Sequence, residues 1–367
     1  MSAVVGTSDI PVPRSAVVLK LARMADFVPG LDLARSLYEE IVAPLVDRPH
    51  AACLLGEGSE VQGFDDERSR DHEWGPRLQL FVDVPDVDRV ARAVRASLPA
   101  QHRGHPTSWF SLDTGRVTDH LEITTLALWM STRLPAVPPA PAGPADWLAI
   151  PQQHLRQLIA GEVFHDDLQD VTRLREGLAW YPTDVWRWML ACQWHLIGQV
   201  LPLLARTRET SDRRGTRLLS ARLTELMMEM AFLQERQYRP YAKWFGRAFE
   251  SLGAARDLGP LLDAGDEATD RALLLLGQRH DELGITDRVG PRIEPFAVGI
   301  ADAVRPYPVL NTPEYIEASV ASIGDRALRD LPRVGSIDQL THADDTLITF
   351  TDWPAALADR YRGQLSS

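Results

Sequence analysis

The spacing of apolar residues changes near residue 135. Before that point, helical spacing over 31–46 and 87–98 alternates with short apolar runs typical of strands, at 51–55, 78–82, 109–112 and 117–125. We expect the strand at 78–82 to extend back toward Asp71, and the last two strands to be joined by a turn at Asp113, Thr114 and Gly115. The pattern predicts a small mixed sheet with a few helices, after a lead-in with little strand character over residues 1–30.

A Pro- and Ala-rich stretch at 135–144 breaks any regular element, and we place a domain boundary there. Beyond it the apolar spacing is almost entirely helical, over 147–159, 168–179, 183–204, 217–237, 241–252, 266–283 and, as the last helix, 313–323. The sequence therefore predicts an α+β protein. An α/β domain with a small mixed sheet occupies 1–134, and a mainly α-helical domain occupies 145–367.

Composition narrows the classes of partner. The formal net charge of −12 argues against binding to duplex DNA, because such binding depends on Lys and Arg neutralising phosphates. The most apolar stretch, 186–205, contains Arg187 and His195, so we expect a buried helix and no membrane span. An N-terminus without a signal pattern and two separated cysteines, Cys53 and Cys192, favour a cytoplasmic protein.

The segment 55–74 combines the features of a phosphate-binding site. Gly58 and Ser59 are followed by eleven residues and then by Asp71 and Glu73. Glycine lets the backbone approach a triphosphate, and backbone amides with a serine hydroxyl can donate hydrogen bonds to its oxygens. Asp71 and Glu73 lie two residues apart, so in an extended strand both point to one face, where they can hold Mg²⁺. Taken alone, each part has a simpler explanation: a turn at Gly58, and a solvated strand face at Asp71.

This arrangement resembles the DNA polymerase β-like nucleotidyltransferase superfamily, whose motif is a hydrophobic residue, Gly, Gly or Ser, a variable spacer, and then Asp, a spacer residue and Asp or Glu. It looks like an uncharacterised bacterial branch with an attached helical domain, and the resemblance continues at 161–166, 181–186 and 238–246. It implies a catalytic domain at 1–134 and a helical domain that closes over the nucleotide. Glu73 stands where Asp is commoner, and His72 stands where the spacer is usually apolar.

The resemblance also implies a third carboxylate on a later strand, which binds metal and can act as a base on the acceptor hydroxyl. Glu122 is our choice, because strand alternation places Leu121 and Ile123 toward the core and Glu122 on the other face. Asp119 is its rival, and Asp113 lies less favourably in a turn. The simpler alternative is that Glu122 is merely exposed.

In the helical domain, Tyr241 and Lys243 follow a helix break at Pro240. The resemblance places them against the nucleotide, with Lys243 on the β- or γ-phosphate and Tyr241 near the base or sugar. Lys243 is one of only two lysines among 39 Lys and Arg residues, which favours a role that Arg cannot fill. For the aromatic residues around them we expect packing between helices; these are Tyr238, Trp244 and Phe245.

Other acidic segments have competing interpretations. Asp65 and Asp66 are expected to organise their loop by accepting hydrogen bonds from backbone amides. Residues 161–167 either line the acceptor pocket or form a helix C-terminus followed by an Asp-rich cap. A metallohydrolase would use the pairs Asp71-His72 and Asp119-His120, and would need their imidazoles to converge on one metal ion.

The leading hypothesis is a nucleotidyltransferase that moves an NMP from an NTP to an acceptor hydroxyl and releases pyrophosphate. It would use two Mg²⁺ ions, for which Mn²⁺ is an alternative. Asp71, Glu73 and Glu122 would be the catalytic and metal-binding residues, and Gly58 and Ser59 would bind the triphosphate together with Tyr241 and Lys243. The acidic charge favours a small-molecule or protein acceptor over RNA. The alternative is a catalytically inactive nucleotide sensor or interaction module with the same fold.

Overall fold

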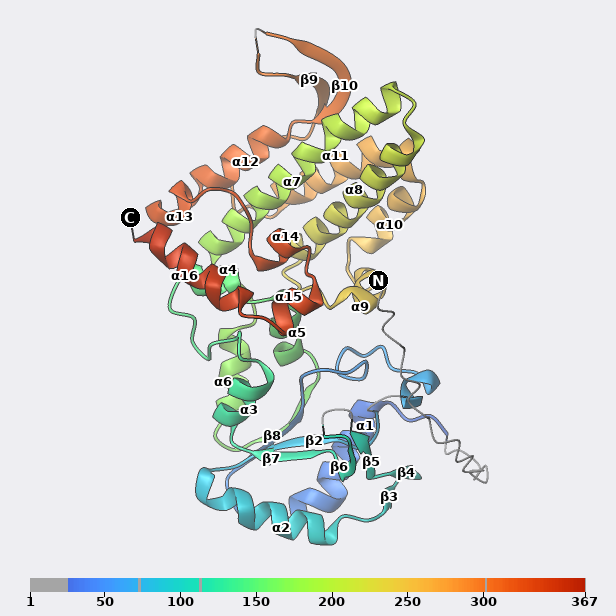
Figure 1. Ribbon diagram of the computed structural model, residues 1–367, viewed down its shortest axis with the longest axis vertical. Helices are drawn as coiled ribbons and strands as arrows, with labels where there is room; N and C mark the ends of the chain where they lie inside the picture. Colours follow the sequence, from blue (N-terminus) through green and yellow to red (C-terminus); the bar gives the residue numbers. More distant parts are fainter. Residues whose placement is uncertain (1–25, 72–73, 112–113, 301, 367) are drawn as a thin grey trace, which may run out of the picture.

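The structure is a computed structural model that describes residues 26–71, 74–111, 114–300 and 302–366. Figure 1 shows a small sheet with α2 on its outer side and a large body of helices on its other side. The molecule is elongated along the direction that runs from the sheet through the helices to a protruding hairpin. It is a mixed α and β fold with a small mixed sheet and a helical C-terminal region, as predicted.

The main sheet has four strands in the order β7-β2-β1-β8. The strand β1 (Ala51–Leu54) pairs antiparallel with β2 (Leu78–Phe81) and with β8 (Glu162–Asp166), whereas β2 pairs parallel with β7 (Leu121–Thr124). A parallel pair needs a crossover, which here contains α2 (Val87–Ser97). The register places Gln79 of β2 beside Glu122 of β7, so these two polar side chains start from one face of the sheet.

The two faces of the sheet have different partners. One face is apolar and packs under α2 and under the helical run that begins at α1, through Ala52, Leu80, Val90 and Leu121 among others. The other face contributes Ala51, Cys53, Leu55 and Phe81 to the core that it shares with the helical region. Glu122 and Gln79 belong to this second face. The sheet therefore presents its polar side chains toward the helices.

The remaining elements around the sheet are short. The helix α1 (Gly30–Leu37) runs on through a π-helical turn, η1 (Tyr38–Val42), and a 3₁₀ turn, η2 (Ala43–Leu45), within the helix that was predicted at 31–46. Two small hairpins, a 3₁₀ turn before α2 and a helix after β7 complete this part; they are β3 (Gln101–His102) with β4 (His105–Pro106), β5 (Ser108–Ser111) with β6 (Arg116–Asp119), η4 (Val84–Asp86) and α3 (Leu126–Arg133). The strand expected at 117–125 is thus divided into β6 and β7.

The fourth strand of the sheet was not predicted. β8 lies beyond the Pro-rich stretch, between two predicted helices, in a segment for which we expected acceptor-pocket lining or a helix C-terminus with an Asp-rich cap. Its pattern of half-buried residues explains why apolar periodicity missed it. Gly161 just before it has φ +68°, and a Cβ there would lie 2.0 Å from the Leu54 carbonyl oxygen, so only glycine fits. The preceding helix therefore does end in a C-terminal glycine, but a strand follows it. In addition, the Asp166 carboxylate accepts from the Thr172 amide (2.8 Å) at the start of the next helix.

The helical region is built around α7 (Thr183–Glu209) and α8 (Arg213–Gln234), which pack along each other. Shorter helices surround them: α4 (Pro144–Ala149), α5 (Gln152–Ile159), α6 (Asp170–Gly177), α9 (Ala242–Phe249), α10 (Ala255–Asp263) and α11 (Thr269–Glu282), the last preceded by the 3₁₀ turn η5 (Gly265–Ala268). Tyr238 and Phe245 are buried in this core, which confirms the expected packing for these two residues, whereas Trp244 is only partly buried and packs against Phe64 outside the helices. Within the described residues α7 alone has the length and apolarity of a membrane span, but 61% of its most apolar window is buried, as in the core helix of a soluble protein.

The C-terminal part differs most from expectation. The strands β9 (Ile293–Ala297) and β10 (Val304–Leu310) pair antiparallel and protrude at one end of the molecule (Figure 1). The predicted last helix is α12 (Thr312–Ala321), but four more follow it: α13 (Arg326–Asp330), α14 (Ile337–Thr341), α15 (Asp345–Thr349) and α16 (Trp353–Leu365). Three of these are only five residues long, which is too short to display a helical repeat in the sequence.

A buried polar network joins α5, α7, α8 and α14. Arg239 and Glu229 form an ion pair at 2.5 Å, and Glu229 also accepts from the Gln193 side chain at 3.1 Å. Asp338 accepts from the Gln152 amide at 3.0 Å and is 2% exposed. Burial raises the pKa of Asp338 to about 6, although the positive charge of Arg239 opposes the shift. The network therefore contains a carboxyl group whose charge is costly in the fold.

Replacing Asp338 with Asn is expected to remove one pH dependence of stability. Because the folded pKa of Asp338, about 6, lies above its unfolded value, the folded chain holds the proton more tightly, and wild-type stability falls as pH rises through that window. The Asn variant can still accept from Gln152 but does not titrate. Relative to it, the wild type should lose on the order of 2 kcal/mol of unfolding free energy between about pH 4 and about pH 7. Urea unfolding at a series of pH values measures the difference, and a constant difference would contradict the assignment.

Candidate active site

The loop after β1, residues 55–64 and called the glycine loop below, has a conformation that requires glycine. Gly56 and Gly58 have φ +88° and +132°. A Cβ on Gly58 would lie 2.3 Å from the Arg77 guanidinium and 2.5 Å from the Glu60 carboxylate. The residue predicted to contact a triphosphate is therefore glycine for a local steric reason as well.

Arg77 and Glu60 form an ion pair that contacts this loop. The Arg77 Nε lies 2.6 Å from the Glu60 carboxylate, and the two side chains are only 16% and 2% exposed. The same guanidinium also donates to the Glu57 carbonyl oxygen. A buried ion pair at the base of a loop fixes its backbone, because removing either partner leaves an uncompensated charge. The sequence analysis identified neither residue. The only indication of Arg77 was its position at the end of the Gly-Pro-Arg sequence at 75–77.

Ser59 lies beside the turn that carries Asp71. Its hydroxyl donates to the Ser69 hydroxyl at 3.1 Å, and Ser69 belongs to the 3₁₀ turn η3 (Glu67–Asp71). Asp66 accepts from the Arg68 amide (2.9 Å) and Asp65 from the Gly30 amide (2.7 Å), so both organise backbone, as expected.

The strand expected to begin near Asp71 does not form there. Asp71 is exposed at the end of η3, and β2 begins only at Leu78, because the buried Trp74, Gly75 and Pro76 intervene. The prediction that Asp71 lies on a strand is therefore wrong. Glu73 and His72 lie outside the described residues, so the orientation of the Asp-x-Glu pair stays a prediction.

Glu122 is partly buried among hydrogen-bond donors and is not merely exposed. Leu121 and Ile123 are buried and Glu122 faces away from them, as the alternation predicted. Its carboxylate accepts from Gln79 Nε2 (2.9 Å), Trp129 Nε1 (3.0 Å) and Arg133 Nε (2.7 Å). Burial acts to raise the pKa of Glu122, but these donors and the charge of Arg133 outweigh it and lower the pKa. Glu122 is thus held ionised in a mostly buried site.

Gln79 connects Glu122 to the glycine loop. Its amide nitrogen donates to Glu122, and its carbonyl oxygen accepts from the Leu55 amide at 2.8 Å, at the point where β1 ends. Trp129, another donor to Glu122, would lie 3.4 Å from a Cβ on Gly56. Glu122 and the loop before Ser59 are therefore neighbours. A polar residue in the strand sequence Leu-Gln-Leu-Phe was the signal that could have identified Gln79.

The helical region reaches the same loop. The Arg156 guanidinium, on α5, donates to the Gln62 side chain and, at 3.0 Å, to the Tyr238 carbonyl oxygen. Phe64, whose amide donates to the Ser59 carbonyl oxygen (2.8 Å), packs against Trp244 at 5.5 Å between ring centroids. Burial lowers the pKa of Arg156, and both acceptors named here are uncharged. Arg156 therefore brings a positive charge to the loop that sequence reasoning did not find.

Tyr241 and Lys243 lie next to this contact. Tyr241 is half-buried, and its pKa is raised first by burial and then by the negative charges of Glu57 and Glu60 in the glycine loop. Lys243 is exposed, with its Nζ 5.0 Å from the centroid of the Trp244 ring. Both candidate residues are thus on the edge of the helical region that meets the loop.

Asp119, the alternative to Glu122 as third carboxylate, and the neighbouring His120 have other partners. Asp119 pairs with Arg95 at 3.1 Å, and His120 stacks on Trp109 with ring centroids 3.8 Å apart. The stacking on Trp109 gives the His120 ring a packing role. Asp113 lies outside the described residues.

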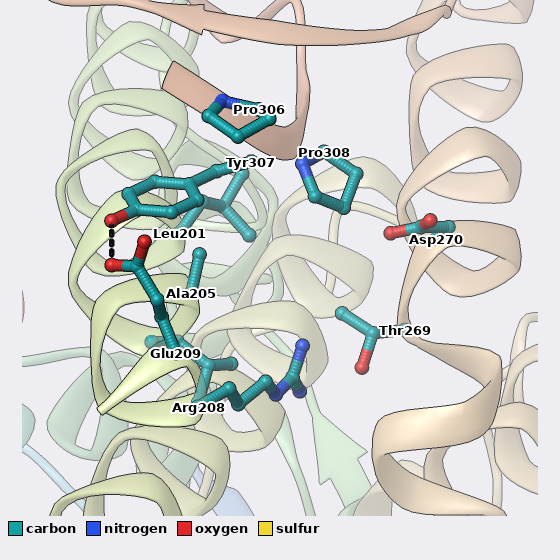
Figure 2. A pocket seen from close by; sticks show the side chains of 10 residues that line it. Leu201, Ala205, Arg208, Glu209, Thr269, Asp270, Pro306, Tyr307 and Pro308 are labelled. Atoms are coloured by element: carbon teal, nitrogen blue, oxygen red, sulfur yellow. Dashed lines mark hydrogen bonds between the residues drawn. The ribbon is translucent and has the colours of Figure 1, made fainter. Parts of the chain in front are cut away.

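A separate cavity of about 310 Å³ lies at the opposite end of the molecule. Figure 2 shows it between α7, α11 and the β10 strand, with the Tyr307 hydroxyl donating to the Glu209 carboxylate. Apolar and proline side chains such as Leu201 and Pro308 form most of its lining. None of the predicted site residues lines this cavity.

Comparison with known proteins gives one match. Residues 147–245, from α4 to α9, match a family model described as a domain of unknown function, DUF4037. No curated protein and no solved structure matches the chain. The matched part includes β8, Arg156, Tyr241 and Lys243, and thus most of the helical side of the candidate site.

Proposed function

We propose that this protein is a nucleotidyltransferase with a DNA polymerase β-like catalytic unit, which transfers an NMP from an NTP to an acceptor hydroxyl and releases pyrophosphate. The acceptor class we favour is a small molecule or a protein, with an RNA end as the third option, because the chain is acidic. We also place the protein in the cytoplasm, since Cys53 and Cys192 are free and buried.

One observation carries the proposal: the ionised Glu122 is joined through Gln79 to the end of β1, from which the Gly58-Ser59 loop leaves. The parallel pairing of β2 with β7 creates this neighbourhood, because it sets Glu122 beside Gln79. The hydrogen bond between Ser59 and Ser69 ties the same loop to the turn that ends at Asp71. The Gly58-Ser59 loop thus contacts the turn before Asp71 on one side and is linked through Leu55 and Gln79 to Glu122 on the other.

The donor set fits Mg²⁺ in its chemistry, since carboxylate oxygens are the ligands that this ion prefers and Glu122 is held ionised. Asp71, Glu73 and Glu122 would hold the ions, with Mn²⁺ as an alternative. Bound there, the ions would polarise the α-phosphorus and stabilise the entering and leaving oxygens. Arg133 is half exposed and pairs with Glu122, so its guanidinium has to move away for that oxygen to reach an ion.

The residues of the chain have separate tasks. The amides of the glycine loop and the Ser59 hydroxyl bind phosphate oxygens, and the positive charges of Lys243 and Arg156 neutralise them. Tyr241 orients the base or sugar from the helical side. Glu122 accepts the proton of the acceptor hydroxyl. Most of the rate then comes from positioning and charge neutralisation.

A second candidate function is a catalytically inactive nucleotide sensor. The pairing of Glu122 with Arg133 favours it, because a fixed arginine can replace the charge of a metal ion. A sensor would bind NTP and change the contact between Phe64 and Trp244 without transferring anything. A metallohydrolase gains no support from His120, which is stacked on Trp109, and its other imidazole, His72, lies outside the described residues.

The test is a transfer assay with each α-labelled NTP, Mg²⁺, and pools of metabolites, tRNA and protein. We expect the wild type to label one pool and the Asp71→Asn variant to lose roughly 100-fold or more of the rate. Asp66→Asn is the matched control, since it makes the same charge change in the same loop and should retain transfer. Label transfer that persists in the Asp71→Asn variant would rule out the metal role, and nucleotide binding without transfer would favour the sensor.

A further inference from the structure

A second group of potential metal ligands lies where β1 begins and β8 ends. His50 directly precedes β1, His165 is in β8, and Asp167 follows β8. One potential ligand atom from each residue lies within 4.8 Å of the other two. None of these residues belongs to the nucleotidyltransferase site proposed above.

The distances fit one small ion. His165 Nε2 lies 2.9 Å from Asp167 Oδ2, and His50 Nδ1 lies 3.6 Å from the same oxygen. In a tetrahedral zinc site with metal–ligand bonds of 2.0–2.2 Å, neighbouring ligand atoms are about 3.4 Å apart. The two distances bracket that value. Small side-chain rotations would suffice to close the site around an ion.

The backbone around the cluster is already fixed. The His50 amide donates to the Asp167 carboxylate at 3.0 Å, and the Asp167 amide donates to the His50 carbonyl oxygen at 3.1 Å. The His50 and His165 rings stack with centroids 4.4 Å apart. The ligands therefore need no folding step to come together, which lowers the entropic cost of binding an ion.

The surroundings of His50 also suit a ligand. Its Nε2 lies 2.9 Å from the hydroxyl of Tyr38, which is buried in the helical run after α1. With the proton on Nε2, the imidazole donates to Tyr38 and presents the lone pair of Nδ1 to the cluster. Such a partner on the second nitrogen fixes the tautomer and ring orientation of metal-binding histidines. In this structure Nδ1 lies 2.8 Å from the Arg48 carbonyl oxygen, which only accepts, so the proton is on Nδ1 and zinc binding requires its transfer to Nε2.

We propose that His50, His165 and Asp167 form a zinc site that clamps β8 to the start of β1. Imidazole nitrogen with one carboxylate oxygen is a ligand set suited to Zn²⁺, whereas Mg²⁺ prefers oxygen alone. His165 and Asp167 have side chains 37% and 40% exposed, so an ion can enter from solvent. Three protein ligands leave the fourth position to water.

The experiment is a titration of the full-length, metal-stripped protein with Zn²⁺ against a chromogenic zinc chelator, with Mg²⁺ in excess. We expect one Zn²⁺ per chain, a rise in the melting temperature on binding, and visible d–d bands of tetrahedral type when Co²⁺ replaces Zn²⁺. These readouts do not depend on nucleotidyl transfer. Asp71→Asn should therefore bind zinc like the wild type.

Two variants test the ligands. His165→Ala removes a half-exposed ligand, and Asp167→Asn removes the charge while keeping an oxygen for the His50 amide; each should weaken zinc binding at least about tenfold. His195→Ala, a half-exposed histidine of α7 that contacts Gln199, is the matched control and should bind as the wild type does. A wild type that takes up no zinc, or folded variants that bind it unchanged, would overturn the proposal.

Discussion

Replacing Glu122 with Gln is expected to lower nucleotidyl transfer by roughly two to four orders of magnitude. In the proposed function Glu122 supplies the only negative charge of the paired strands β2 and β7, and this charge both attracts the metal ions and accepts the proton of the acceptor hydroxyl. The amide has nearly the same shape but no charge. Multiple-turnover rates with a saturating NTP measure the effect once an acceptor pool has been identified.

The same substitution has a smaller effect on stability. The carboxylate accepts from Gln79, Trp129 and Arg133, whereas an amide offers one oxygen and turns its NH₂ group toward a donor. An unsatisfied buried donor costs about 1–3 kcal/mol. The variant should therefore unfold at a lower urea concentration but remain folded under assay conditions, which circular dichroism can verify.

Asp119→Asn is the matched control for Glu122→Gln. Asp119 lies three residues earlier and pairs with Arg95 outside the glycine loop contact, so losing its charge should leave transfer within about twofold. The role of Glu122 would be refuted if both variants retained transfer. A large loss with Asp119→Asn alone would instead identify Asp119 as the third carboxylate.

The second large effect is on stability, from the buried ion pair in the helical region. Replacing Arg239 with Met should lower the unfolding free energy by about 3–5 kcal/mol, because it leaves the Glu229 carboxylate buried without its partner. The Arg239 and Glu229 side chains are only 4% and 10% exposed. Burial already raises the pKa of Glu229. In the variant this carboxylate can therefore take up a proton, which reduces the cost of its buried charge.

Chemical denaturation of two further variants separates the pair from general packing. Arg256→Met removes an exposed arginine that pairs with Asp257, and should change stability by less than about 0.5 kcal/mol. In the double variant Arg239→Met/Glu229→Gln, the uncompensated charge is gone, and part of the lost stability should return. If the single Arg239→Met variant were as stable as the control, the pair would not be the stabilising unit described here.

The periodicity of apolar residues was sufficient to predict the central elements. β1, β2 and α2 lie within predicted segments, and α7 and α8 overlap most of theirs, with α7 running five residues further and α8 beginning four residues earlier than predicted. The orientation of Glu122 also followed from alternation. What could not be read was the pairing: nothing local in 162–166 indicates a strand, because β8 is defined by its partner β1 and not by its own half-buried residues.

The site was predictable to the same extent. Gly58, Ser59 and Glu122 were proposed from motif and alternation; the structure places Glu122 next to the end of β1, and the catalytic roles stay predictions. The supporting residues Glu60, Arg77 and Gln79 were missed, because a charged or amide side chain in a buried position becomes meaningful only when its partner from another segment is known. Asp71 was placed on a strand because the Gly-Pro pair at 75–76, which marks a turn, was not used to limit the strand that begins at Leu78.

The origin of β8 bears on how the chain can be made and divided. A fragment that stopped at the Pro-rich stretch would leave one side of β1 with unpaired backbone amides and carbonyls, a template for association with other chains. During synthesis, the growing polypeptide cannot close its sheet until residue 166 has left the ribosome, by which time α4 and α5 have already emerged. The sheet of the N-terminal part is thus completed only after the first helices of the C-terminal part have been synthesised.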